Sequence, residues 1–198
     1  MLFVSRITSL VLVVALLPTA AAAFTGKNPL VVFETEFGRI QIQVFVREAP
    51  RTSRNFLRYV DEGRFSGASF YRVVHLENQP ENDVKIEVVQ GGLGNEDQPG
   101  ALPPIGHETT ETTGIVHRDG VISMARNEPG SASSEFFICI GEQPELDFGG
   151  RRNPDGQGFA AFGEVVEGME VVRRIQQLPS TSQRLDQEVA ITAVYRSK

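Results

Sequence analysis

Residues 30–44 read LVVFETEFGRIQIQV, and this stretch is the clearest indication of how the chain folds. Residues 30–35 are mostly apolar and β-branched, and residues 40–44 alternate apolar and polar side chains, as in a strand buried on one face. The intervening Glu36-Phe37-Gly38-Arg39 is typical of a turn, in which Gly38 can adopt a positive φ. We therefore predict an N-terminal β-hairpin.

The same patterns, followed outward from the hairpin, predict more strands than helices. A first helix is expected over residues 50–62, with Thr52 as its N-cap and Gly63 as its stop, and a second over residues 168–178. In the closing strand, Val189, Ile191, Ala193 and Tyr195 are expected to share one face. The strands predicted after the hairpin cover residues 69–75, 86–90, 121–125, 135–140, 159–166 and 189–195.

Two helices among about eight strands, without regular alternation, argue against a parallel α/β sheet. A closed antiparallel barrel is the natural alternative, because closure removes exposed strand edges. We therefore predict a mainly β fold, an eight-stranded barrel capped by two α-helices. Residues 76–83, 93–111 and 148–158 are expected to be surface loops of one domain.

The net charge and the cysteine count limit the classes of protein to which the chain can belong. The chain has 198 residues and a formal net charge of −6, which gives no support for binding nucleic acid. Cys139 is the only cysteine, so an intramolecular disulfide is impossible. It lies within the apolar run Phe136-Phe137-Ile138-Cys139-Ile140, where we expect a buried thiol and not a nucleophile.

The first residues have the pattern of a secretory signal. Arg6 supplies a positive charge, residues 7–17 are largely apolar, and Ala21 and Ala23 fit a small-residue cleavage site before Phe24. The expected division is a signal peptide at residues 1–23 and a mature domain at 24–198. The alternative is an uncleaved membrane anchor. Cleavage would make the protein exported: periplasmic in a Gram-negative bacterium, and otherwise secreted or within the secretory pathway.

Three short segments place chemically useful side chains on predicted strands. These segments are Phe70-Tyr71-Arg72, Gln90-Gly91-Gly92 and Ser134-Glu135-Phe136-Phe137-Ile138-Cys139. A barrel could present one arginine, one glutamine amide and one phenylalanine ring from them to a common pocket. Such a pocket suits a ligand with a polar amide and an apolar ring, which describes proline within a peptide.

These segments resemble the cyclophilins, which are peptidyl-prolyl cis-trans isomerases. The resemblance runs from about Leu30 to Tyr195 and includes several further motifs in the family's order: Ala49-Pro50-Arg51-Thr52-Ser53-Arg54-Asn55-Phe56, Ile122-Ser123-Met124-Ala125-Arg126, Leu146-Asp147 and Phe162-Gly163-Glu164-Val165. It implies the eight-stranded barrel with two helices. It also implies an isomerase that needs no cofactor or metal and acts on proline-containing polypeptides.

The resemblance also implies roles for individual residues. Arg72 falls on the catalytic arginine, Gln90 on the glutamine that holds the substrate backbone, and Phe136 on the phenylalanine that floors the proline pocket. The other positions are core, wall or backbone-pairing positions. They are Met124 and Phe137 (core or pocket wall), Ala125 and Arg126 (pairing with the extended peptide), Leu146 (wall) and Phe159 (a position often held by histidine).

The chain departs from the family pattern at three places. Glu87 and Val88 stand where an aromatic residue and a methionine are common, so either the pocket lacks one aromatic wall or Ile86 or a loop residue replaces it. Glu145 stands at the position of a tryptophan linked to cyclosporin binding, which predicts weak cyclosporin affinity. Arg151-Arg152, in the long 148–158 loop, either contacts acidic flanks of a substrate or is simply solvated.

The leading hypothesis is thus an exported, monomeric prolyl isomerase that assists the folding of secreted proteins. An alternative is a proline-peptide binding module or chaperone with little turnover, which the altered wall at Glu87 and Val88 would allow. A third possibility is a metal-dependent hydrolase using His107 and His117, although no HExxH spacing is present.

Overall fold

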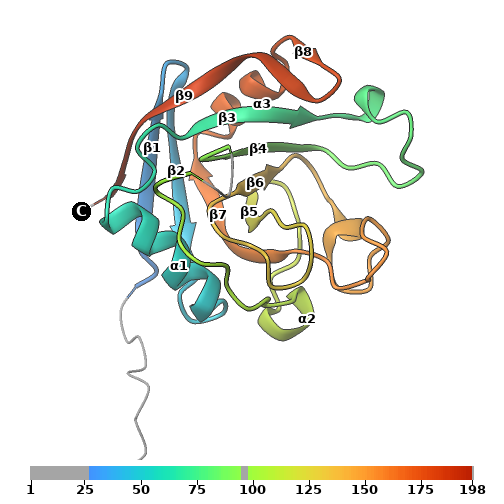
Figure 1. Cartoon of the computed structure of the whole chain (residues 1–198), viewed down its shortest axis with the longest axis horizontal. Helices are drawn as coiled ribbons and strands as arrows, with labels where there is room; N and C mark the ends of the chain where they lie inside the picture. The colour runs from blue at the N-terminus through green and yellow to red at the C-terminus, as the bar shows by residue number, and fades with distance from the viewer. Residues whose placement is uncertain (1–26, 95–97, 198) are drawn as a thin grey trace, which may run out of the picture.

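The computed structural model describes residues 27–94 and 98–197. The predicted signal peptide and its cleavage site therefore lie outside the described residues. Strands dominate the described chain, and the helices are short (Figure 1). The elements in chain order are β1 (Leu30–Thr35), β2 (Gly38–Val44), α1 (Pro50–Asp61), β3 (Ser69–Val74), β4 (Val88–Gly92), α2 (Thr110–Thr113), β5 (Val121–Met124), β6 (Phe136–Cys139), β7 (Ala160–Glu167), α3 (Met169–Gln176), β8 (Ser180–Thr181) and β9 (Arg184–Arg196).

The sheet closes on itself. Its strand order is β1-β2-β7-β5-β6-β4-β3-β9-β8, and β1 also pairs with β9. Every pairing is antiparallel, and β8 pairs only with β9, outside the ring of eight strands. Helix α1 contacts β7 and β9, and α3 contacts β2, β3 and β4. The predicted eight-stranded antiparallel barrel with two covering helices is confirmed. The short α2 and β8 were not predicted.

Helix α1 begins differently from the prediction. Thr52 is not its N-cap, because the helix starts at Pro50 and Ala49 occupies the cap position without a side-chain hydrogen bond. The carboxylate of Glu108 serves this end of the helix, accepting from the backbone N–H groups of Arg51 and Thr52 at 3.1 and 2.7 Å. The Thr52 hydroxyl donates to the same carboxylate at 2.7 Å. A loop distant in sequence thus satisfies helix N–H groups that are otherwise unpaired.

Strand β9 also corrects a prediction. Val189 and Ile191 are buried as expected, but Tyr195 is 39% exposed and Val194 packs against the core instead. The cause is a β-bulge: Glu34 pairs with Ala193 and Thr35 with Ile191, so Thr192 is an extra residue. One extra residue reverses the inward and outward alternation of everything beyond it.

The apolar side chains form two clusters on opposite sides of the barrel wall. The larger cluster fills the interior, where Phe136 and Ile138 point inward from β6. The smaller one lies on the outer face of the same strand and contains Val88, Phe137 and Cys139. Cys139 is fully buried, as predicted, and burial raises the pKa of its thiol. This outer cluster is the foundation of the site described next.

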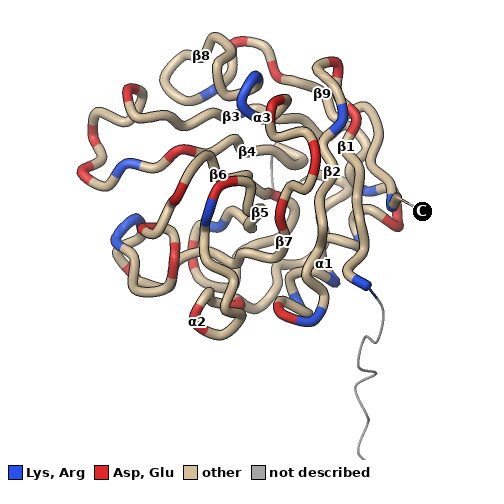
Figure 2. Tube along the Cα trace, turned by 180° about the vertical axis from the view of Figure 1, so that it is seen from behind, with Lys and Arg blue, Asp and Glu red and all other residues tan. Residues whose placement is uncertain are grey.

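Basic and acidic residues are interspersed along the chain and concentrate on no single element (Figure 2). Within the described ranges, 27–94 and 98–197, no helix has the length and apolarity required to cross a bilayer.

Candidate active site

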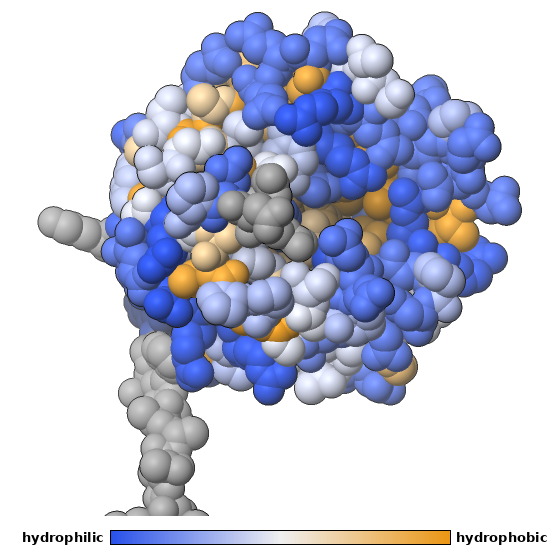
Figure 3. Space-filling model, viewed as in Figure 1, coloured by the Kyte–Doolittle hydropathy of each residue, from blue (hydrophilic) through white to orange (hydrophobic). Residues whose placement is uncertain are grey.

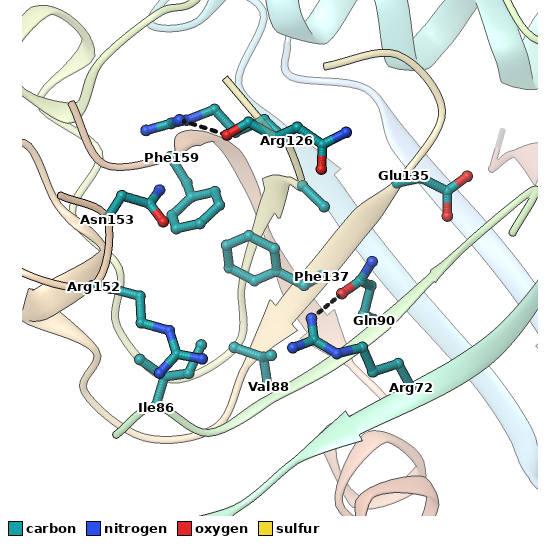
Figure 4. Close-up of a pocket in the computed structure, with 12 residues that line it drawn as sticks. Arg72, Ile86, Val88, Gln90, Arg126, Glu135, Phe137, Arg152, Asn153 and Phe159 are labelled. Atoms are coloured by element: carbon teal, nitrogen blue, oxygen red, sulfur yellow. Dashed lines mark hydrogen bonds between the residues drawn. The ribbon is translucent and has the colours of Figure 1, made fainter. Parts of the chain in front are cut away.

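A cavity of about 290 Å³ opens on the outer face of β3, β4 and β6. On the face shown in Figure 3, apolar residues are visible within a hollow bordered by hydrophilic ones. Figure 4 shows the lining side chains, which come from β3, β4 and β6, from residues just before β4, β6 and β7, from the 125–127 segment and from the 148–158 loop. They are Arg72, Ile86, Val88, Gln90, Ala125, Arg126, Asn127, Glu135, Phe137, Arg152, Asn153 and Phe159.

Arg72 and Gln90 form the polar wall. They are direct neighbours across β3 and β4, and Arg72 Nη1 donates to Gln90 Oε1 at 2.6 Å. Arg72 Nε also donates to Gln183 Oε1 at 3.0 Å, so two amide oxygens orient the guanidinium. Burial lowers the pKa of Arg72 from its ordinary value, although an arginine this basic remains charged at neutral pH. The predicted arginine and glutamine therefore lie together at the cavity.

A bulge in β3 adds a second polar contact to this wall. Phe70 pairs with Gly91 and Arg72 with Gln90, which leaves Tyr71 as the extra residue. Gln90 Nε2 donates to the Tyr71 hydroxyl at 2.7 Å, while Gln90 Oε1 accepts from Arg72. Both ends of the amide are thus engaged, which fixes its orientation. Two consecutive β3 residues reach one partner because a bulge redirects side chains locally.

Glu135, the residue directly before β6, anchors this network. Its carboxylate accepts from the Tyr71 hydroxyl at 2.5 Å and from the backbone N–H of Leu93 at 2.9 Å. A side chain at Gly92, whose φ is +144°, would clash with this carboxylate, since a Cβ there would lie 2.6 Å from Oε2. Burial, and then the neighbouring Glu135, raises the pKa of Tyr71, so its hydroxyl stays protonated and donates. Neither Tyr71 nor Glu135 was predicted to have a role, although both lie in the segments 70–72 and 134–139 that supply the site.

The apolar floor corrects the predicted one. Phe136 was expected to form the floor, but it is fully buried in the barrel interior, 5.3 Å from the ring of Phe33. Phe137 lines the cavity instead and meets Phe159 edge to face, with ring centroids 5.2 Å apart. Neighbouring residues of a strand point to opposite faces, and the outward face is the one that bears the cavity.

Two other predicted site residues lie behind the cavity wall. Met124 is 2% exposed and belongs to the interior core, and Leu146 is fully buried beneath the floor in the outer cluster. Ala125, Arg126 and Phe159 do line the cavity.

His117 supports the floor from below. Its ring stacks on Phe137, with centroids 5.9 Å apart and planes 17° apart. Its Nδ1 bonds to Asp147 at 2.7 Å and its Nε2 to Ser123 at 3.0 Å. The triplet resembles a serine-hydrolase triad in composition, but Ser123 and His117 are sealed from solvent and do not line the cavity. Its observed contact is with the floor ring, which it holds in place.

Around Glu87 and Val88, where the chain departs from the family pattern, three side chains form the cavity wall. Ile86 and Val88 point to the cavity, and Glu87 between them does not line it. Arg152 from the 148–158 loop completes this side (Figure 4). Ile86 and a loop residue thus occupy this side, and neither of them supplies an aromatic ring.

The two histidines of the metal hypothesis have separate contacts. His107 Nε2 lies 3.0 Å from the carbonyl oxygen of Gln157, whereas His117 is engaged by Asp147 and Ser123. In the part of the chain that the structure describes, no group of three or more His, Cys, Asp or Glu side chains is arranged to hold a metal ion.

Comparisons with known proteins agree on one family. The family model described as cyclophilin type peptidyl-prolyl cis-trans isomerase/CLD matches residues 30–196. The chain is 36% identical over 163 residues to peptidyl-prolyl cis-trans isomerase cyp18 of Streptomyces antibioticus, covering 81% of this chain and 90% of that protein. It is 34% identical over 164 residues to peptidyl-prolyl cis-trans isomerase B of Escherichia coli, covering 81% and 92%.

The fold has matching solved structures. A cyclophilin type peptidyl-prolyl cis-trans isomerase from Cryptosporidium parvum superposes with a TM-score of 0.69 at 20% identity, covering 86% of this chain and 98% of that one. A crystal structure of the same protein in the presence of the dipeptide Ala-Pro gives a TM-score of 0.68 at 21% identity, covering 85% and 99%.

Proposed function

The chain belongs to the cyclophilin family of peptidyl-prolyl cis-trans isomerases, and from this we propose that it catalyses rotation about X-Pro bonds in exported polypeptides and so assists their folding. The observation that carries the proposal is the position of Arg72. Its guanidinium, oriented by Gln90 and Gln183, lies at a cavity floored by Phe137 and Phe159.

Rotation requires no covalent step. Resonance in the peptide C–N bond creates a barrier of about 18–20 kcal/mol. The resonance is lost when the amide twists, and the lone pair then localises on the proline nitrogen. A guanidinium donor directed at that nitrogen stabilises the twisted amide more than the planar one, which lowers the barrier. A rate gain of ~10⁶ corresponds to about 8 kcal/mol of such differential stabilisation.

The surroundings of Arg72 favour this role. Phe137, Val88 and Phe159 provide an apolar seat for the proline ring, and excluding water strengthens the electrostatic contact. Gln90 already uses one N–H and one lone pair within the protein. Its second N–H and second lone pair are available to the substrate backbone.

The test is a protease-free isomerisation assay on residues 24–198 with a proline tetrapeptide. We expect rapid cis-to-trans exchange, and a loss of most of it in Arg72→Ala with the circular dichroism spectrum unchanged. Wild-type activity in that variant would contradict the role of Arg72. Peptide binding without exchange in the unaltered protein would favour the alternative of a binding module.

We also propose export. The pattern at residues 1–23 supports it, and the test is N-terminal sequencing of the protein recovered outside the cytoplasm of the producing cell. Phe24 is the expected first residue. A retained Met1, or recovery only from the membrane fraction, would support the anchor alternative. We expect the mature protein to be a monomer, and light scattering at two concentrations tests this.

Weak cyclosporin binding is a further part of the proposal. Glu145 does not line the cavity, and its carboxylate pairs with Arg151 at 2.7 Å. The exposed indole expected at this position in many relatives is therefore replaced by a solvated ion pair. Nanomolar affinity in calorimetry would contradict this expectation.

A further inference from the structure

We propose that the cavity prefers peptides with an acidic side chain next to the proline, and that Arg152 together with Arg72 binds this carboxylate. The inference rests on the proposed isomerase function and extends it to substrate selection.

The position of Arg152 is fixed by two neutral acceptors. Its Nη1 donates to Gln79 Oε1 at 3.1 Å and to the carbonyl oxygen of Val84 at 2.6 Å. Figure 4 shows its guanidinium beside Ile86, on the same side of the cavity as the Arg72 guanidinium. The two cations thus lie on one side of the apolar floor, Arg72 beside Gln90 and Arg152 beside Ile86, and we place the side chain next to a bound proline between them.

The charges at the cavity do not cancel. Among the residues that the structure describes, neither Arg72 nor Arg152 has a carboxylate partner, since both are bonded to amide or backbone oxygens. The third cation, Arg126, is neutralised by Asp155 at 2.8 Å. The lining carboxylate, Glu135, keeps its negative charge, but it accepts from the Tyr71 hydroxyl and lies at the far side of the cavity from Arg152 (Figure 4).

The two unpaired cations also influence each other. Burial lowers the pKa of Arg152, and the nearby charge of Arg72 lowers it further. Two like charges in a partly desolvated cavity are unfavourable, and an anion that contacts them relieves the repulsion. A carboxylate fits a guanidinium particularly well, because its two oxygens accept parallel N–H donors. A neutral side chain offers no such compensation.

Arg151 provides an internal comparison. It precedes Arg152 in the same loop, but its guanidinium is exposed, pairs with Glu145, and does not line the cavity. Substituting either arginine removes one positive charge from the loop, yet only Arg152 faces the substrate.

The experiment compares kcat/KM for matched peptides. Two series carry Glu, Gln or Lys, one immediately before the proline and the other immediately after it, and exchange is followed by NMR. We expect a Glu-to-Gln ratio on the order of five to ten in at least one series, the size expected for one charge-assisted contact, and a lower rate for Lys. Arg152→Gln should bring the ratio close to one, Arg152→Lys should restore part of it, and Arg151→Gln should preserve it.

Because the Glu-to-Gln ratio of kcat/KM is taken within each variant, a general loss of activity in that variant cancels out. The preference should also weaken as sodium chloride is raised from 50 to 500 mM, by screening. Equal rates for Glu and Gln peptides in both series, or a ratio unchanged in Arg152→Gln, would overturn the inference. If no peptide is isomerised, the proposed function fails. Calorimetric Kd values for the Glu and Gln peptides then decide the acidic preference on their own.

Discussion

Phe136 and Phe137 are adjacent in the chain but belong to different parts of the molecule. Phe136 is fully buried in the interior, where it meets the rings of Phe33 and Phe70. Phe137 belongs to the outer cluster and lines the cavity. The same substitution at the two positions should therefore separate stability from activity.

We expect Phe136→Leu to lower the free energy of unfolding by about 1–2 kcal/mol, because it removes ring contacts from a closely packed core. The folded variant should keep near-normal kcat/KM. Phe137→Leu should lower kcat/KM by roughly tenfold, because the proline ring loses its aromatic floor. Urea titrations and the exchange assay measure the two quantities. An equal loss of activity in both folded variants would show that this division is wrong.

At the scale of single residues, the sequence predicts which residue types supply the site better than it predicts the face to which each side chain points. Arg72 and Gln90 could be assigned to one pocket because their segments carry distinctive residue types. The choice between Phe136 and Phe137 could not be made in the same way, because alternation alone does not say which face bears the cavity. Tyr71 and Glu135 gain their contacts only through the bulge and the close approach at Gly92. Neither feature has an unambiguous local pattern.

The β3 bulge is the element that joins the arginine to its supporting network. It places Tyr71 and Arg72 against the same glutamine, Gln90, and the Tyr71 hydroxyl in turn donates a hydrogen bond to Glu135. Removing the Tyr71 hydroxyl should free one end of the Gln90 amide while leaving Arg72 itself intact.

We expect Tyr71→Phe to reduce kcat/KM by about fivefold to tenfold, because Gln90 loses its fixed orientation. Tyr195→Phe is the matched control, since that hydroxyl bonds to Glu34 on an exposed part of the barrel. The exchange assay on both variants provides the measurement. Unchanged activity in Tyr71→Phe would indicate that Arg72 alone keeps Gln90 in place.

Helix α1 depends on a carboxylate from outside the helix. Glu108 accepts hydrogen bonds from Arg51 and Thr52, in the place of a local cap. We expect Glu108→Ala to lower the free energy of unfolding by about 1–2 kcal/mol, as losing an N-cap does. Glu81→Ala, at an exposed loop position, makes the same change in net charge and should have little effect. Equal urea midpoints for the two variants would contradict the capping role.

The Glu108 contact also marks a limit of sequence analysis. The helix was predicted from its apolar spacing, and its boundaries are nearly correct. Its cap was assigned to Thr52 because local patterns can point only to local partners. The bulge at Thr192 likewise reversed the predicted faces of β9 beyond Ile191, since a bulge depends on the partner strand and not on the strand's own sequence.

At the scale of the whole molecule, closure is what the sequence predicted most successfully. Strand β2 alternates buried and less buried side chains, whereas β5 and β6 are buried throughout, and a barrel is the arrangement that pairs all of these strands without an exposed edge. Closure also predicts how the molecule opens. Strand β6 is hydrogen-bonded on both sides, to β4 and β5, so it cannot separate without breaking the ring.

Cys139 on β6 reports on this opening. Its thiol is fully buried and its pKa is raised by burial, so little reactive thiolate is present in the native state. We expect its labelling by an alkylating reagent at pH 8 to be slow in water and to accelerate with urea in parallel with global unfolding. Ser66→Cys, at an exposed position, should be labelled rapidly throughout. Mass spectrometry of both sites gives the rates. Fast labelling of Cys139 well below the unfolding midpoint would mean that β6 and the cavity floor open without the rest of the barrel, and the floor would then be a mobile part of the site.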